Sequence, residues 1–136
     1  MKNVCTIECE TDINGNISIS KNGKLQYTDM KSVTYENHRV QKCYYENGLD
    51  AYAVLYKAGS RKPIKFIAWY PFEKDGIQQV KTFGYYNEKG KQSGWWYFRD
   101  ENNTLFMRNK SGDTRNPTDE EKNNFDKEFM KFKNIN

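Results

Sequence analysis

The stretch GYYNEKGKQSGWWYFRDENNTLFM, residues 84–107, decides the fold class of this chain. It sets groups of aromatic residues between short turns rich in Asn, Gly and Lys, and this alternation is typical of antiparallel strands joined by tight connections. A small β protein cannot bury so many large, flat side chains, so we expect part of them to lie on the surface as a contact area. The stretch contains no cluster of catalytic side chains.

Turn signals of the same kind recur at short, fairly even intervals along the chain. Asn-Gly and Asp-Gly pairs favour hairpin turns because both residues adopt positive φ at little cost, and they occur at positions 14–15, 22–23, 47–48 and 75–76. Such spacing predicts a meander, in which each strand pairs with the next. The predicted strands are residues 3–10, 16–20, 24–28, 32–36, 39–45, 51–57, 64–70, 77–86, 95–99 and 104–108.

The end of the chain has a different pattern. Thr118 and Glu121 have the spacing of a capping box, in which the hydroxyl and the carboxylate each accept a backbone N–H at the start of a helix. Three phenylalanines follow at helical spacing, at positions 125, 129 and 132. We therefore predict a C-terminal helix at about residues 118–133 that covers apolar surface of the sheet.

Length and composition complete the fold prediction. A chain of 136 residues is long enough for one core. Only 36% of the residues are hydrophobic but 15% are aromatic, so the core must be built largely from Phe, Tyr and Trp. We predict a mainly β chain of the α+β class, with one β-rich domain over residues 1–136. Its architecture would be a bent antiparallel meander sheet or a half-open barrel with one C-terminal α-helix.

The amino terminus and the cysteines bear on the compartment. The start, MKNVCTIECETD, lacks the apolar stretch of a signal peptide, and no segment is apolar enough to span a bilayer. Cys5, Cys9 and Cys43 are an odd number of cysteines, which fits free thiols in a reducing cytoplasm better than a disulfide framework. A net charge of +4 gives only a weak preference for anionic partners. We expect a cytoplasmic protein without a membrane association.

Period-two alternation assigns the strand residues to faces. In residues 64–70, it places Lys65, Ile67 and Trp69 on a face that we expect to be partly wet. In residues 95–99, Trp96 and Phe98 form the more apolar pair, which leaves Trp95, Tyr97 and Arg99 on the opposite face. Trp, Tyr and Arg are enriched at binding hot spots. The predicted partner-binding residues are Trp95, Tyr97, Arg99, Trp69 and Tyr85, with Lys65 and Arg108 on the rim. The alternative is that both faces are buried, one of them under the helix.

Three groups of residues are candidates for catalysis or metal binding. His38, the single histidine, lies in a predicted turn without an evident partner, which favours a solvated surface residue. The three cysteines and His38 could together form a zinc site, but the Cys5-to-Cys9 spacing within a strand differs from that of structural zinc ligands. Glu8, Glu10 and Asp12 share a strand face, for which solvation is the simpler explanation. We expect no catalytic residues, no metal and no cofactor.

A module for single-stranded nucleic acid is the second interpretation. Lys65, Lys81, Arg99 and Arg108 lie in or beside aromatic strands, and such binders combine basic residues with aromatic rings that stack on bases. The charge surplus is small and no RNP-like motif is present, so we place this interpretation below protein binding.

Two segments resemble the variant MORN repeat, whose pattern is an aromatic pair, a polar turn that ends in Gly, and then Gly-Lys-Trp-x-Tyr-Tyr. They are YYENG at residues 44–48 and YYNEKGKQSGWWYF at residues 85–98, where Trp95 stands in place of the usual Lys. Such repeats occur in bacterial antitoxin-like proteins, and the chain is similar in general character to immunity proteins of contact-dependent inhibition. The resemblance implies an inhibitor that binds a cognate bacterial toxin domain, for example a nuclease, and occludes its active site. A homodimer through exposed aromatic residues stays open as an alternative.

Overall fold

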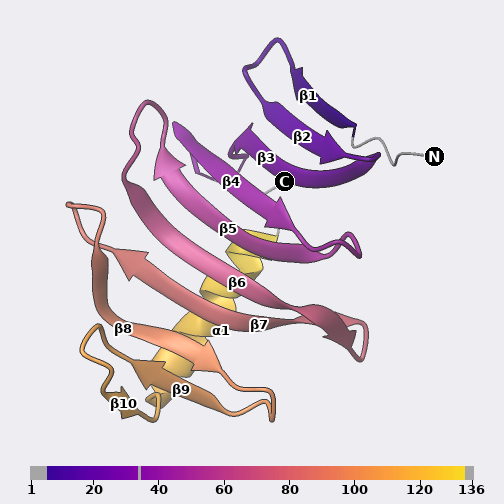
Figure 1. Cartoon of the computed structure of the whole chain (residues 1–136). Coiled ribbons are helices and arrows are strands. Elements are labelled where there is room, and N and C mark those ends of the chain that lie inside the picture. The colour runs from indigo at the N-terminus through magenta and orange to yellow at the C-terminus, as the bar shows by residue number, and fades with distance from the viewer. Residues whose placement is uncertain (1–5, 34, 134–136) are drawn as a thin grey trace.

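The computed structural model describes residues 6–33 and 35–133, and within them the chain forms one antiparallel sheet and one helix (Figure 1). Every strand pairs with its neighbour in the chain, so the strand order in the sheet is the order in the sequence. Among the described residues, β1 pairs only with β2 and β10 only with β9, so the sheet is not closed. The strands are β1 (Ile7–Thr11), β2 (Ile17–Lys21), β3 (Lys24–Lys31), β4 (His38–Tyr44), β5 (Asp50–Lys57), β6 (Pro63–Lys74), β7 (Ile77–Tyr86), β8 (Gln92–Arg99), β9 (Leu105–Arg108) and β10 (Thr114–Arg115).

The predicted meander is therefore confirmed, and its turns form for the predicted reason. In the β2–β3 hairpin, Asn22 and Gly23 have φ values of 52° and 76°, and in the β6–β7 hairpin Asp75 and Gly76 have values of 54° and 77°. Two successive residues with positive φ match the right-handed twist of the strands that they join. The short turns leave room only for antiparallel neighbours, which is why the sheet has no crossover.

Two details of the predicted strands are wrong. The described residues of the predicted strand 32–36, which are 32, 33, 35 and 36, belong to the connection between β3 and β4, where the backbone N–H of Tyr35 donates to the hydroxyl of Ser32 at 3.0 Å. A serine that accepts a nearby backbone N–H stabilises a turn in place of a sheet ladder. The two-residue strand β10 is absent from the predicted set. Residues 3–5 of the first predicted strand lie outside the described residues.

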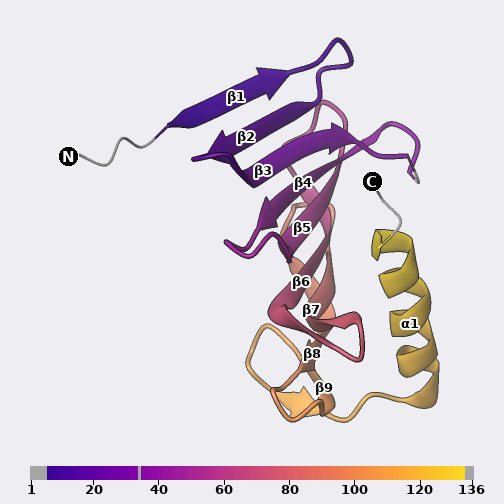
Figure 2. The ribbon, with the colours of Figure 1, turned by 90° about the vertical axis from the view of Figure 1, so that its right-hand side faces the viewer.

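Helix α1 (Asp119–Lys133) lies on one face of the sheet, behind β5 to β9 in Figure 1 and beside the sheet in Figure 2. Its predicted capping box is confirmed. The backbone N–H of Glu121 donates to the hydroxyl of Thr118 at 3.2 Å, and the N–H of Thr118 donates to the Glu121 carboxylate at 2.9 Å. Of the three predicted phenylalanines, Phe125 is buried, whereas the side chains of Phe129 and Phe132 lie outside the described part of the structure.

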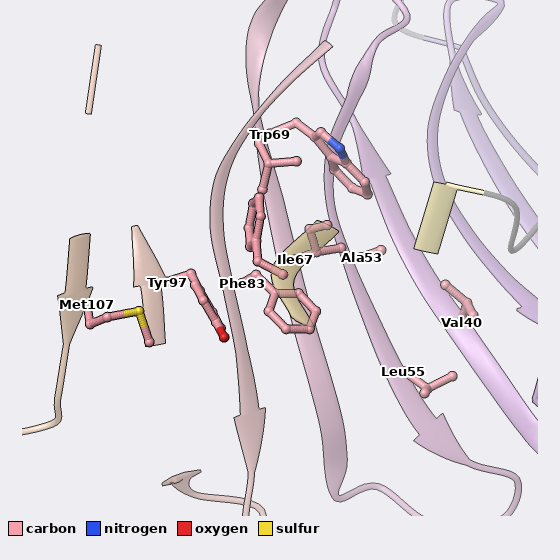
Figure 3. Close-up of a cluster of buried hydrophobic side chains, with 10 residues drawn as sticks. Val40, Ala53, Leu55, Ile67, Trp69, Phe83, Tyr97 and Met107 are labelled. Atoms are coloured by element: carbon pink, nitrogen blue, oxygen red, sulfur yellow. The ribbon is translucent and has the colours of Figure 1, made fainter. Parts of the chain in front are cut away.

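The core fills the space between α1 and the sheet face that it covers, called here the helix face. The core extends across the sheet through residues that lie opposite each other on neighbouring strands. Ile67 pairs with Phe83, Phe83 with Tyr97, and Tyr97 with Met107. Figure 3 shows this arrangement from Met107 on β9 to Val40 on β4. The buried apolar residues of the core are Val40, Ala53, Leu55, Ile67, Trp69, Val80, Phe83, Tyr97, Met107 and Phe125.

Candidate interaction surface

Most of the predicted partner-binding residues lie on the helix face. Trp69 and Tyr97 are only 3% and 4% exposed and belong to the core. The expectation that the face of Ile67 and Trp69 is partly wet is therefore wrong, because α1 covers it. A side chain sealed under a helix cannot contact a partner directly, so Trp69 and Tyr97 are corrected to core residues.

Two other predicted residues on this face, Trp95 and Arg99, pack around the anchor of α1, by which we mean Arg115, Glu121 and Phe125. Trp95 is partly buried, and the guanidinium of Arg115 lies 4.6 Å from the centre of its ring. Arg115 in turn donates two hydrogen bonds of 2.7 Å to the carboxylate of Glu121 on α1. The guanidinium of Arg99 lies 5.5 Å from the ring of Phe125. Trp95 and Arg99 thus help to hold the helix on the sheet, a role that cation–π contacts suit.

Lys65 and Tyr85 form a separate group on the same face. The ammonium of Lys65 lies 3.2 Å from the hydroxyl of Tyr35 and 4.8 Å from the centre of that ring. It also lies 5.6 Å from the centre of the Tyr85 ring. Of the seven predicted residues, only Arg108 lies on the opposite side of the sheet, which is called here the open face.

The open face carries a row of aromatic rings that continues from strand to strand. Tyr52 of β5 stacks on Phe66 of β6 with ring centres 5.9 Å apart, and Phe66 stacks on Trp96 of β8 with ring centres 5.8 Å apart. We call Tyr52, Phe66 and Trp96 the aromatic row. Tyr86 of β7 packs edge-on against Trp96 at 5.2 Å. Tyr52 is 41% exposed at one end of the row.

The row crosses strand β7 because that strand has a glycine at the crossing point. Gly84 pairs with Phe66 and lies beneath the indole of Trp96, so a Cβ at residue 84 would come within 2.0 Å of the ring. The indole N–H donates to the carbonyl of Tyr85 at 3.0 Å and fixes the ring orientation. Trp96 therefore reaches from β8 across β7 to Phe66 on β6, and only 7% of it is exposed.

A second stack of rings lies beside the row and carries a cation. Phe98 of β8 and Phe106 of β9, called here the aromatic pair, stack with ring centres 5.7 Å apart. The guanidinium of Arg108 lies 5.1 Å from the Phe98 ring and 5.4 Å from the Phe106 ring. At the far end of β6, Tyr70 stacks on the exposed Phe72, and the ammonium of Lys81 lies 5.8 Å from the Tyr70 ring.

A polar network borders the open face on strands β3 to β5. Arg39 donates to the carboxylate of Asp29 at 2.9 Å, and the hydroxyl of Tyr56 donates to the same carboxylate. Burial, together with the hydrogen bond to the Asp29 carboxylate, raises the pKa of Tyr56 to about 12. Beside the network is a cavity of about 460 Å³. The cavity is lined by Asp29, Gln41, Val54, Tyr56, Ser60, Arg61 and Pro63.

The candidate residues for catalysis or metal binding lie apart from this surface. Nδ1 of His38 lies 2.6 Å from the carbonyl oxygen of Glu36 in the β3–β4 connection. Cys9 and Cys43 are free cysteines, while Cys5 falls outside the described residues. Among the side chains that the structure describes, no three of His, Cys, Asp or Glu lie close enough together to hold a metal ion.

Comparison of the chain with protein-family models, with curated proteins and with solved structures finds no match. Within the part of the chain that the structure describes, no helix has both the length and the apolar character needed to cross a membrane. The open face and its geometry are therefore the basis for a functional assignment.

Proposed function

We propose that this chain acts by stoichiometric binding of a protein partner to the open face of β5 to β9, without turnover. The observation that supports this proposal best is the aromatic row. Trp96, itself buried, crosses Gly84 and holds the ring of Phe66 in place beside the exposed Tyr52, which can contact a partner. Rings that are ordered before binding lose little conformational entropy when a partner docks, and aromatic residues with Arg at the edge are the usual hot spots of interfaces.

The size of the open face suits a protein partner. Five strands at a spacing of about 4.8 Å span roughly 19 Å, and an eight-residue strand extends for about 26 Å. The resulting area, on the order of 500 Å², approaches the roughly 800 Å² per partner of a standard interface once the polar rim is added. The cavity beside Tyr56 and the cation at Arg108 lie at opposite margins of this area and could fix the orientation of the partner.

Within this class, we propose that the chain is an immunity protein that neutralises a cognate toxin domain by covering its active site. Its resemblance to variant MORN repeats supports this assignment, as does an interaction surface that needs no catalytic residue. The cognate toxin is expected to be encoded in the adjacent reading frame. Co-purification of that product with this chain at one to one, with loss of toxin activity at the same ratio, is the expected result.

Two exposed residues of the open face provide a test that leaves the core intact. Tyr52→Ala and Arg108→Ala should each weaken toxin binding by about 2 kcal/mol or more, which is about 30-fold. Ile77→Ala removes an exposed apolar side chain from the β6–β7 hairpin and is the matched control. Isothermal titration with each variant measures the affinity. Equal affinities for all three variants and the parent would remove the open face from consideration.

Binding of single-stranded nucleic acid is the second candidate, and the same stacked rings favour it. Arg108 over the aromatic pair and Lys81 over Tyr70 place cations beside rings, as modules that stack bases do. This candidate predicts that oligonucleotides bind with an affinity that falls steeply with salt. Oligonucleotide binding that is lost in Arg108→Ala, together with no one-to-one toxin complex, would favour it over the immunity protein.

A further inference from the structure

Strand β1 forms one edge of the sheet, and its outer side is open in the part of the chain that the structure describes. It pairs with β2 alone, and all five of its residues are exposed. The opposite edge strand, β10, has only two residues. Among the described residues no other strand pairs with β1 (Figure 1). An edge strand of this length, with unpaired N–H and C=O groups, is a template for one more strand.

The hydrogen bonds of the β1–β2 ladder show which backbone groups point outward. The carbonyl of Thr6 accepts the N–H of Asn22 at 2.8 Å, and the N–H of Asp12 donates to the carbonyl of Asn16 at 3.0 Å. Hydrogen-bonded residues alternate along an antiparallel strand, so the even-numbered residues of β1 bond to β2. Consequently the N–H and C=O groups of Ile7, Cys9 and Thr11 face the open edge.

The side chains of β1 give this edge a defined chemistry. Glu8 and Glu10 share one face and are both exposed, and among the described residues neither forms a salt bridge. Ile7, which is 67% exposed, and Cys9 lie on the other face. On the open side, Glu8 and Glu10 would occupy non-hydrogen-bonded pairs with an added strand. Cα atoms in such pairs are only about 4.5 Å apart, so the side chains come closest there.

A second copy of this chain is a poor occupant of the edge. If two β1 strands paired around a two-fold axis at Cys9, Glu8 of each copy would lie opposite Glu10 of the other. An axis at Glu8 or at Glu10 would place that residue opposite itself. Like charges directly opposite each other destabilise a sheet. The acidic side chains therefore oppose self-pairing in the registers centred on residues 8 to 10 and favour an occupant of opposite charge.

We propose that β1 is a docking edge for an extended basic segment of a partner protein, which adds to the sheet as an antiparallel strand. Lys or Arg side chains of that segment would lie opposite Glu8 and Glu10, and small apolar side chains would lie beside Ile7 and Cys9. Main-chain hydrogen bonds from Ile7, Cys9 and Thr11 would supply the affinity, and the charges would set specificity and register. This site is separate from the open face and does not depend on the function proposed for that face.

The first test uses a peptide as the probe. A capped seven-residue peptide of alternating Val and Lys is titrated to millimolar concentration into the isotopically labelled chain, and a peptide with Glu in place of Lys is the control. The Lys peptide should shift the amide resonances of residues 7–11 and slow the hydrogen exchange of Ile7, Cys9 and Thr11. The Glu peptide should bind at least about tenfold more weakly. No shifts with the Lys peptide, or equal binding of both peptides, would overturn the proposal.

Two variants make the test specific to the edge. Cys9→Pro removes an outward N–H but leaves the bonds of Glu8 and Glu10 to β2, so it should abolish peptide binding while the β1–β2 resonances stay dispersed. Glu8→Lys makes the edge self-complementary, because the introduced ammonium would then lie opposite Glu10 of a second copy. Its dimer fraction in sedimentation should rise at least about tenfold above that of the parent, and the Glu8→Lys/Glu10→Lys double variant should return to the parent value. Unchanged peptide binding by Cys9→Pro, or an unchanged dimer fraction for Glu8→Lys, would contradict the proposal.

Discussion

The indole of Trp96 occupies the space in which residue 84 would otherwise carry a side chain. A Cβ built on Gly84 would lie 2.0 Å from Cδ2 of Trp96, far inside van der Waals contact. This relationship lets a residue of β8 stack on a residue of β6 across the intervening strand. Without the glycine, the aromatic row would be interrupted at β7.

The first prediction concerns this glycine. Gly84→Ala should lower the free energy of unfolding by about 1 to 3 kcal/mol, because the added methyl group forces the Trp96 ring off its position. Urea denaturation measures the change. In a Trp96→Leu background the same substitution should cost much less, so the two effects should not be additive. A Gly84→Ala variant as stable as the parent would contradict the stacked arrangement.

The second prediction concerns the anchor of α1. The hydrogen bonds from Arg115 hold the pKa of the Glu121 carboxyl down to about 2, against an ordinary value of 4.5. Because the folded-state pKa is the lower one, this carboxylate stabilises the fold above pH 4.5, and its contribution is lost as the pH falls toward 2. Glu121→Gln should cost about 1 kcal/mol at neutral pH.

The difference in the free energy of unfolding between Glu121→Gln and the parent should narrow steadily as the pH falls below 4.5. Urea denaturation of both proteins at a series of pH values measures that gap. Glu120→Gln is a suitable control, because Glu120 is an exposed acid in the same helical turn. A constant gap from neutral pH to the acid limit would show that the Arg115 pair does not stabilise the helix start.

The third prediction concerns the polar network beside the open face. Tyr56 has its pKa raised to about 12 from an ordinary value of 10.0, first by burial and then by its hydrogen bond to Asp29. The neutral phenol is therefore favoured in the folded state, so its contribution to stability is complete below pH 10 and is lost as the pH rises toward 12. The ultraviolet titration of the parent minus that of Tyr56→Phe should show one phenol with a pKa of about 12. A difference curve centred on the ordinary value would exclude the hydrogen bond to Asp29.

The fourth prediction concerns a buried cation on the helix face. The side chain of Lys42 is only 4% exposed, and its ammonium lies 3.3 Å from the carboxylate of Asp50 and 5.9 Å from the ring of Trp69. Asp50→Asn should cost about 2 kcal/mol, because it leaves the cation without a counter-charge in a dry site. Lys42→Met should cost less than about 1 kcal/mol, since the partly exposed Asp50 can turn to water. Chemical denaturation measures the free energy of unfolding of both variants. Equal losses in the two variants would contradict the ion pair between Lys42 and Asp50.

The sequence predicts local features of this fold well. Asn22-Gly23 and Asp75-Gly76 form the predicted hairpins because positive φ is a property of the residues themselves. The helix start at Thr118 and Glu121 forms for a similar reason, since its hydrogen bonds join residues three apart. The strand predicted at residues 32–36 is wrong because the hydroxyl of Ser32 accepts the backbone N–H of Tyr35, and this local bond competes with strand formation there.

The covered face of the sheet could not be predicted in the same way. The alternation of side chains along a strand places Trp95, Tyr97 and Arg99 on the face opposite Trp96 and Phe98. It does not predict which of the two faces the helix covers. Residue types favour Trp95, Tyr97 and Arg99 as the contact set, whereas Tyr97 is in the core and Phe98 stacks on Phe106 on the open face. The available signal was Gly84, a strand glycine amid aromatic residues, because such a glycine often marks close approach by another group.

The most direct test of the open face is a photo-crosslinking comparison of the two sides of the sheet. A benzophenone side chain is placed at Tyr52 on the open face in one variant and at Trp95 on the helix face in another. Each variant is then irradiated with the product of the adjacent reading frame, which is the proposed toxin. We predict a covalent adduct from position 52 and none from position 95. An adduct from position 95 with none from position 52 would contradict the account.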